Sequence, residues 1–68
     1  MLIRRVVTES GLQQAQIASD AGLSYAGIRA WLKGEREPQP DSIKKLADGL
    51  RKRAAKLEKL AAQLDKEV

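Results

Sequence analysis

Hydrophobic residues recur every three or four positions along most of the chain, which predicts an all-α protein. Their spacing predicts a first helix over residues 2–9, which Gly11 ends. Two further short helices are expected over residues 13–20 and 24–33. A helical composition then continues from residue 40 to about residue 66, interrupted by a single glycine. The pattern therefore indicates about five helical segments, the last of them long and amphipathic.

The long C-terminal segment is expected to form either one helix or two helices bent at Gly49. Pro40 suits the first position of a helix, and Asp41 suits the positive N-terminal end. A glycine inside a helix costs about 1 kcal/mol relative to alanine, which permits a bend but does not require one. The sequence leaves the choice open.

The second and third predicted helices meet at a tight turn. Gly22 stands where a helix ends and the chain adopts a positive φ, and Ser24 can cap the next helix by accepting from the amide of Ala26 or Gly27. With one residue between the two signals, the helices must cross closely, and Ala18 supplies a small side chain one turn before the glycine. The expected shared core is Ile17, Ala21, Leu23, Ile28 and Trp31, with Leu32 beside them.

These features resemble the Cro/C1 repressor type of helix-turn-helix domain, a lambda-repressor-like fold of phage and bacterial regulators. The resemblance covers residues from about 11 to 50 and rests on these matching pieces: Gln14, Ile17-Ala18, Gly22-Leu23-Ser24, Ile28, Trp31, the loop 34–38, and Ile43, Leu46, Ala47 and Leu50. It implies that the helix over residues 24–33 enters the DNA major groove while the preceding helix lies across the backbone. A generic helical hairpin is the alternative.

The resemblance also implies a set of DNA-contacting residues. The matching positions here are Gln14, Ser24, Tyr25, Ala26, Arg29, Ala30 and Lys33, and Arg36 in the following loop is a further candidate for a phosphate. Family members often carry glutamine, arginine or serine where this chain has Tyr25, Ala26 and Gly27. Hydrogen-bonding donors to bases are therefore few, and Arg29 is the leading candidate, since an arginine can bind guanine O6 and N7 together.

A heptad pattern follows in the C-terminal segment. Alanine at one core position alternates with leucine three residues later, and Leu46 and Leu60 widen the stripe. Such a stripe must pack against its own domain or a second copy, and the pairing can be parallel or antiparallel. We expect a homodimer through Leu50, Ala54, Leu57, Leu60, Ala61 and Leu64, with a DNA-binding domain over residues 1–50 and a dimerisation helix over residues 51–68.

The net charge of +4 favours an anionic partner, but the charge is unevenly distributed. Residues 44–59 hold seven cations against two anions. Five of these cations are candidates for phosphate contact: Lys44, Lys45, Arg51, Lys52 and Arg53. An ordinary solvated helix face is an equally good reading.

Composition argues against several function classes. The chain of 68 residues has no cysteine and no histidine, so no metal site, no cofactor site and no enzyme is expected, and no small-molecule ligand is evident. No apolar run reaches the length of a membrane span and the N-terminus does not read as a signal peptide, so a cytoplasmic protein with no membrane contact is expected.

The sequence favours a homodimeric repressor that binds double-stranded DNA at a pseudo-palindromic operator, as in phages or mobile elements. Two other classes remain open. One is an assembly component that also binds DNA, such as a small packaging-terminase subunit or a transposition accessory factor. The other is an antitoxin-like module whose long helix docks on another protein.

Overall fold

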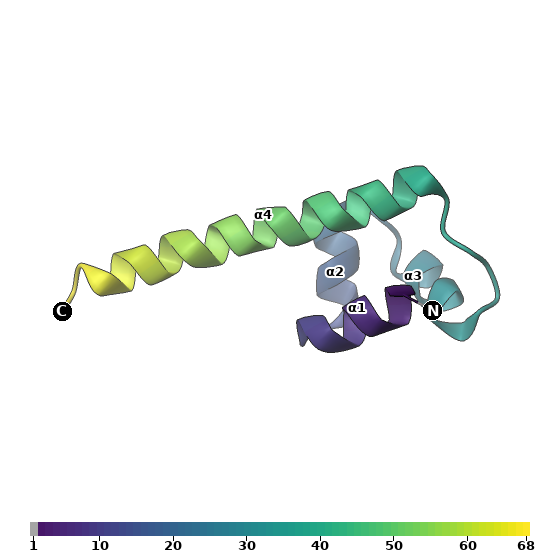
Figure 1. Ribbon diagram of the computed structural model, residues 1–68, viewed down its shortest axis with the longest axis horizontal. Helices are drawn as coiled ribbons and strands as arrows, with labels where there is room; N and C mark the ends of the chain where they lie inside the picture. Colours follow the sequence, from purple (N-terminus) through teal and green to yellow (C-terminus); the bar gives the residue numbers. More distant parts are fainter. Residues whose placement is uncertain (1) are drawn as a thin grey trace.

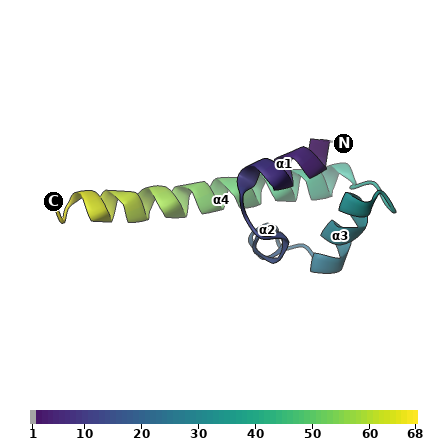
Figure 2. The same ribbon diagram turned by 90° about the horizontal axis from the view of Figure 1, so that it is seen from below.

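The computed structural model describes residues 2–68, which fold into four helices (Figure 1). They are α1 (Leu2–Ser10), α2 (Gln14–Ala21), α3 (Tyr25–Lys33) and α4 (Pro40–Asp65). The three short helices lie on one side of the first half of α4, where α2 contacts it, and the second half of α4 extends beyond them (Figures 1 and 2). The molecule is therefore elongated, with extents of 48 × 20 × 17 Å.

The turn between α2 and α3 has the predicted structure. Gly22 adopts φ 69°, and the next amide, that of Leu23, donates to the Ala18 carbonyl oxygen at 2.9 Å. This bond and the one from the Gly22 amide to the Ser19 carbonyl oxygen satisfy carbonyls that the end of α2 would otherwise leave without partners. The hydroxyl of Ser24 then accepts a hydrogen bond from the Gly27 amide at 3.0 Å, as an N-cap does. The turn is thus held at both helix ends.

The core lies where the three short helices meet. Its buried members are Ile3, Ile17, Ala18, Ile28 and Trp31, and Ile28 has no exposed surface. Ile17, Ile28 and Trp31 were predicted to be core residues, whereas Ala21 and Leu23 are only partly buried. Side chains from α1, α2 and α3 pack together in this core, and close packing holds α2 and α3 at a fixed angle.

Residues 40–65 form a single helix, so four helices replace the expected five in the described part of the chain. Gly49 does not mark a bend, and it is the one buried residue of α4. A Cβ at this position would lie 2.9 Å from both the Cα and the backbone nitrogen of Ala21. Glycine therefore allows the C-terminal end of α2 to approach the backbone of α4.

Two long-range polar contacts fix the short helices. The Arg53 guanidinium on α4 forms a two-bond ion pair with the Asp20 carboxylate on α2, with 3.1 Å between Nη2 and Oδ1. Bidentate geometry of this kind is the strong form of a charge-assisted hydrogen bond. On the other side, Arg4 of α1 donates to the Leu32 carbonyl oxygen in the last turn of α3 at 2.6 Å, where the helix dipole favours a cation.

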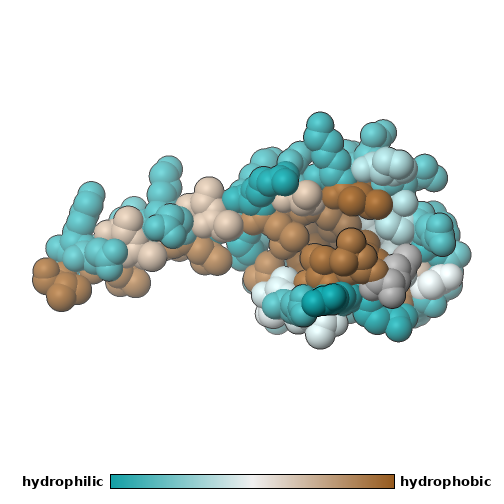
Figure 3. Space-filling model, in the orientation of Figure 1, coloured by the Kyte–Doolittle hydropathy of each residue, from teal (hydrophilic) through white to brown (hydrophobic). Residues whose placement is uncertain are grey.

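The second half of α4 leaves its apolar stripe in solvent. Leu57, Leu60 and Leu64 are 53%, 46% and 69% exposed. Figure 3 shows apolar surface along one edge of this extension and hydrophilic surface along the other. The chain alone thus offers no cover for that edge among its described residues.

Candidate nucleic-acid interface

An open groove of about 860 Å³ lies between the N-terminal end of α2 and one side of α3. Gln14 contributes to one wall and Tyr25, Arg29 and Lys33 to the other. The C-terminal end of α1 and the link to α2 complete the lining with Val7, Thr8, Gly11, Leu12 and Gln13. Four of the predicted DNA-contacting residues therefore share one concave surface.

The first turn of α2 is organised by its own side chains. The backbone amide of Gln13 donates to Gln16 Oε1 at 3.1 Å, and the Gln13 side chain in turn caps an amide of the first turn. This reciprocal arrangement is a capping box, and it fixes the start of the helix at Gln14. Gln14 takes no part in the capping box, so its side-chain amide remains available to an anion near the positive end of the helix.

At the start of α3, Gly27 makes room for the cap on Ser24. A Cβ at Gly27 would lie 2.9 Å from the Ser24 hydroxyl oxygen. The small residue at this position therefore has a structural reason, since the hydroxyl accepts from the Gly27 amide. The hydroxyl proton of Ser24 is still free to be donated to another acceptor.

Tyr25 and Arg29 form a pair on the exposed face of α3. The Arg29 guanidinium carbon lies 5.8 Å from the centre of the Tyr25 ring, within the range of a cation–π interaction. The two residues are one helical turn apart, so their side chains share a face. Tyr25 is 47% exposed. The pair presents a positive group held beside an aromatic ring to whatever enters the groove.

The other predicted residues of this region do not line the groove. Ser24, Ala26 and Arg36 are exposed, and Ala30 is partly buried. Thr8 and Gln13 line the groove but were missed, because both precede the recognisable helix-turn-helix residues. The turn at Gly11, with φ 69°, brings them beside α3, and only the three-dimensional path reveals this.

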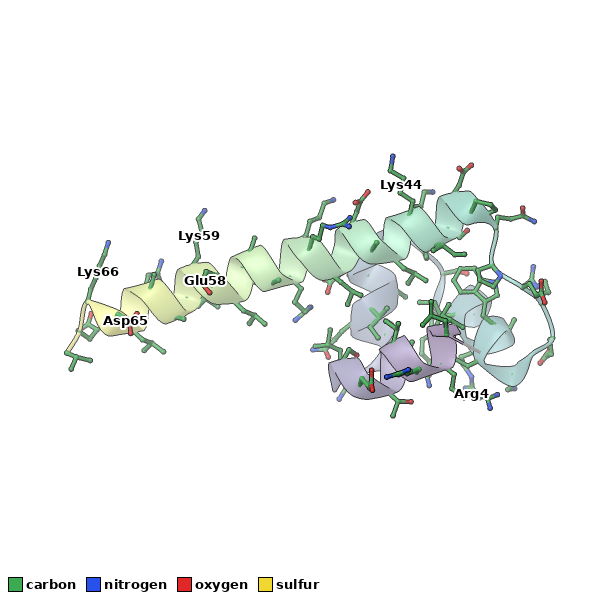
Figure 4. The ribbon with its side chains drawn as sticks, viewed as in Figure 1. Arg4, Lys44, Glu58, Lys59, Asp65 and Lys66 are labelled. Atoms are coloured by element: carbon green, nitrogen blue, oxygen red, sulfur yellow. The ribbon has the colours of Figure 1, made fainter. Side chains whose placement is uncertain are left out.

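The candidate phosphate contacts on α4 are distributed differently. Arg53 is engaged with Asp20, and Arg51 lies 3.0 Å from Asp48 in an exposed ion pair. Lys44 points away from the three short helices, as do Lys59 and Lys66 (Figure 4). Since the C-terminal end of α2 contacts α4, Gln14 lies at the far end of α2, about 10 Å further away at 1.5 Å per residue. Lys44 and Gln14 therefore lie on opposite sides of the molecule.

The ion pair between α2 and α4 changes the acidity of its members. Hydrogen bonding from Arg53 is the main cause that holds the pKa of the Asp20 carboxyl below its ordinary value of 3.8, and the positive charge of Arg53 adds to it. The same bonds raise the pKa of Arg53. Both side chains are about one-fifth exposed, so the pair is partly sheltered from solvent at the helix junction.

Of the predicted dimerisation residues, Leu50 is partly buried against the short helices. The others, Ala54, Leu57, Leu60, Ala61 and Leu64, are all exposed on the extension of α4.

In the described residues 2–68, no helix is both long and apolar enough to cross a membrane.

Comparison with known proteins agrees with this geometry. A helix-turn-helix family model matches residues 3–57, which includes α1, α2, α3 and most of α4. No curated protein and no solved structure was found to match the chain. Because the match covers most of the chain, and because the turn, caps and core have the required arrangement, the protein belongs to the helix-turn-helix family of the Cro/C1 type, whose members are DNA-binding regulatory domains.

Proposed function

We propose that the protein is a sequence-specific transcriptional regulator that places α3 in the major groove of duplex DNA. One observation supports this most strongly: Gln14, Tyr25, Arg29 and Lys33 line a single open groove beside the exposed face of α3. The docking geometry of this family then puts the start of α2 over one strand of the backbone.

Arg29 is the main base-reading residue in this proposal. Its guanidinium can donate to guanine O6 and N7 at once, which discriminates against other bases by about 1–3 kcal/mol. Tyr25 restricts the guanidinium through the contact between ring and cation, so less side-chain entropy is lost on binding. The ring itself can pack against a thymine methyl group.

Phosphate contacts position the helix. Gln14 and the free backbone amides at the start of α2 bind one phosphate. Lys33, at the C-terminal end of α3, binds another. Ser24 and Arg36 are further donors at the two ends of α3, and Ala26 and Ala30 let the helix approach the bases. Lys44, which points away from the three short helices in Figure 4, is not part of this interface.

The regulator acts as a homodimer and represses transcription by covering a promoter, as phage and mobile-element repressors do. The exposed leucines of the α4 extension supply the dimer contact. Two copies would then place their α3 helices in successive major grooves about 34 Å apart, on a pseudo-palindromic site. An isolated domain with so few donors gains specificity from this doubling of half-sites.

The same exposed extension also fits an oligomeric assembly subunit or a module that docks on another protein. Light scattering separates these from the dimer. A mass of two chains supports the regulator, eight or more chains favour the assembly subunit, and a monomer favours the docking module.

Selection of binding sites from random DNA duplexes tests the proposal as a whole. We expect an enriched pair of inverted half-sites with a guanine at the position facing Arg29, with centres about one helical turn apart. Recovery of random sequences, or of single half-sites only, would contradict the proposal of a sequence-specific dimer.

A further inference from the structure

A second groove, apolar and separate from the DNA-facing groove, lies between α1 and the first half of α4. It has a volume of about 390 Å³. Leu2 and Val6 of α1 line one side, and Ile43, Ala47 and Leu50 of α4 line the other. Leu2 is 74% exposed and Ile43 is 52% exposed, so the groove is largely open to solvent.

The groove and the exposed leucines lie on one continuous face of α4. Positions 43, 47, 50, 54, 57, 61 and 64 follow one another at steps of three or four residues, which places them on one stripe of a helix. The first three line the groove, and the last four belong to the exposed extension. The apolar edge of the extension runs toward the helical bundle in Figure 3.

We infer that two copies pair through α4 in antiparallel orientation, so that the extension of each copy fills the α1–α4 groove of the other. This inference rests on the proposed dimer and names its geometry, but it does not depend on DNA binding. In a parallel pair, extension would face extension and groove would face groove, and the α1 side of each groove would receive no helix.

Side-chain sizes favour the antiparallel register. When Leu50 is placed opposite Ala61 of the second copy, Ala54 lies opposite Leu57 and Ala47 lies opposite Leu64. Each of these layers then combines one large and one small side chain, which lets two helices approach closely and interdigitate. A parallel pairing would stack alanine on alanine and leucine on leucine.

Charges at the edge of the stripe agree with the same register. The residues next to Leu50 and Leu57 are Arg51 and Glu58. In an antiparallel pair the flanking positions of one kind face each other, so Arg51 of each copy faces Glu58 of the other copy, which makes two symmetric contacts. Both contacts join opposite charges. Lys59 and Lys66 point to the outer side and stay clear of the interface (Figure 4).

Cysteine cross-linking tests the orientation directly, because the native chain contains no cysteine. Ala47→Cys and Leu64→Cys are made as two separate proteins, and cysteine behaves as a small apolar side chain on the stripe. In the antiparallel register residue 47 faces residue 64, whereas two copies of residue 47 lie about 25 Å apart at 1.5 Å per residue. Under mild oxidation without DNA, the mixture should form a mixed disulfide dimer and neither protein alone should do so.

Two results would overturn the inference. One is disulfide formation by either variant alone as readily as in the mixture, which indicates a parallel pair. The other is the absence of any cross-link together with a monomeric mass at about 50 μM, well above the dissociation constants of stable dimers. Folding of each variant is checked by thermal unfolding, so that loss of structure is not mistaken for loss of pairing.

A charge exchange provides a second, independent measurement. Arg51→Glu and Glu58→Arg should each weaken the dimer by about 3- to 10-fold, and the double variant should return to within about 2-fold of the native protein. Failure of the double variant to recover would contradict the register. DNA binding is measured separately by fluorescence anisotropy, so a protein that cross-links as expected but binds no duplex refutes the proposed function and leaves the dimer geometry standing.

Discussion

Gly49 of α4 lies against Ala21, the last residue of α2, so closely that a Cβ on Gly49 would stand 2.9 Å from the Ala21 Cα. The neighbouring ion pair between Asp20 and Arg53 joins the same two helices. Together these contacts attach α2, and with it the helix-turn-helix, to α4 through backbone packing and one ion pair. In the proposed dimer, the orientation of α3 relative to the second copy would depend on this junction.

Replacement of Gly49 by alanine should destabilise the protein. Alanine inside a solvated helix normally stabilises it by about 1 kcal/mol relative to glycine. Here the added methyl group would clash with backbone atoms of Ala21, which cannot move away as a flexible side chain could. Overpacking of this kind costs about 1–3 kcal/mol. The net result should be a free energy of unfolding that is lower by up to about 2 kcal/mol for Gly49→Ala in urea denaturation.

Ala55→Gly, in the solvated part of the same helix, measures the intrinsic preference of α4 alone and should cost about 1 kcal/mol. If Gly49→Ala instead raised the free energy of unfolding by as much as Ala55→Gly lowers it, α4 would not approach the backbone of Ala21 closely at Gly49.

The ion pair at the same junction predicts a dependence on pH. Since Arg53 lowers the pKa of Asp20 below 3.8, the pair contributes its full stabilisation above that pH, and the contribution is lost as the pH falls through the lower, folded-state pKa. Asp20→Asn should therefore have a lower free energy of unfolding than the native protein between about pH 4.5 and about pH 7. The difference in free energy between the two proteins should shrink below pH 3.8. Urea denaturation at several pH values across both ranges measures this.

Asp48→Asn is the matched control, because Asp48 also pairs with an arginine on α4 but in an exposed position. It should change stability by less than about 0.5 kcal/mol. If Asp20→Asn and Asp48→Asn gave the same curves across this pH range, the Asp20–Arg53 pair would not be a structural link.

Much of the fold was predictable because its signals are local. Gly22 and Ser24 mark helix ends through backbone geometry that each residue dictates by itself, and the structure places them as expected. The core residues Ile17, Ile28 and Trp31 follow from helical spacing. The role of Gly49 was not predictable, since its reason lies in Ala21, 28 positions earlier.

The candidate site was predicted only in part, for a related reason. The exposed face of α3 follows from periodicity, but the lining by Thr8 and Gln13 depends on the path of the chain around Gly11. Charge composition likewise grouped Arg53 with the neighbouring lysines, although its guanidinium is bound to Asp20. A charge pattern records which residues are basic and does not record which of them already have a partner.

Arg29→Ala should weaken binding to the selected duplex and relax the preference for one base pair. The expected loss is about 1–3 kcal/mol, roughly 5- to 150-fold in the dissociation constant. Arg5→Ala removes the same charge from an exposed position on α1, where Arg5 pairs with Glu9. Fluorescence anisotropy should show little change for Arg5→Ala. Equal losses for the two variants would reduce Arg29 to a general electrostatic contact.

Leu57→Glu should produce monomers and weaken binding to the full operator more than binding to non-specific DNA. A carboxylate on the apolar stripe would be buried without a partner on pairing, which should raise the dimer dissociation constant by at least about 100-fold. Gln63→Glu introduces the same charge elsewhere on the extension and off the stripe. If sedimentation gave the same mass for Leu57→Glu as for Gln63→Glu, the extension would not be the dimer contact.

The central claim is that α3 and the start of α2 form the DNA interface. Backbone amide chemical shifts, recorded by NMR while the selected duplex is added to the native protein, test it most directly. We expect the largest changes at residues 13–15 and 24–33, with small changes at Lys44, Lys59 and Lys66 on the outer face of α4. Large changes along that outer face, with residues 24–33 unmoved, would contradict it.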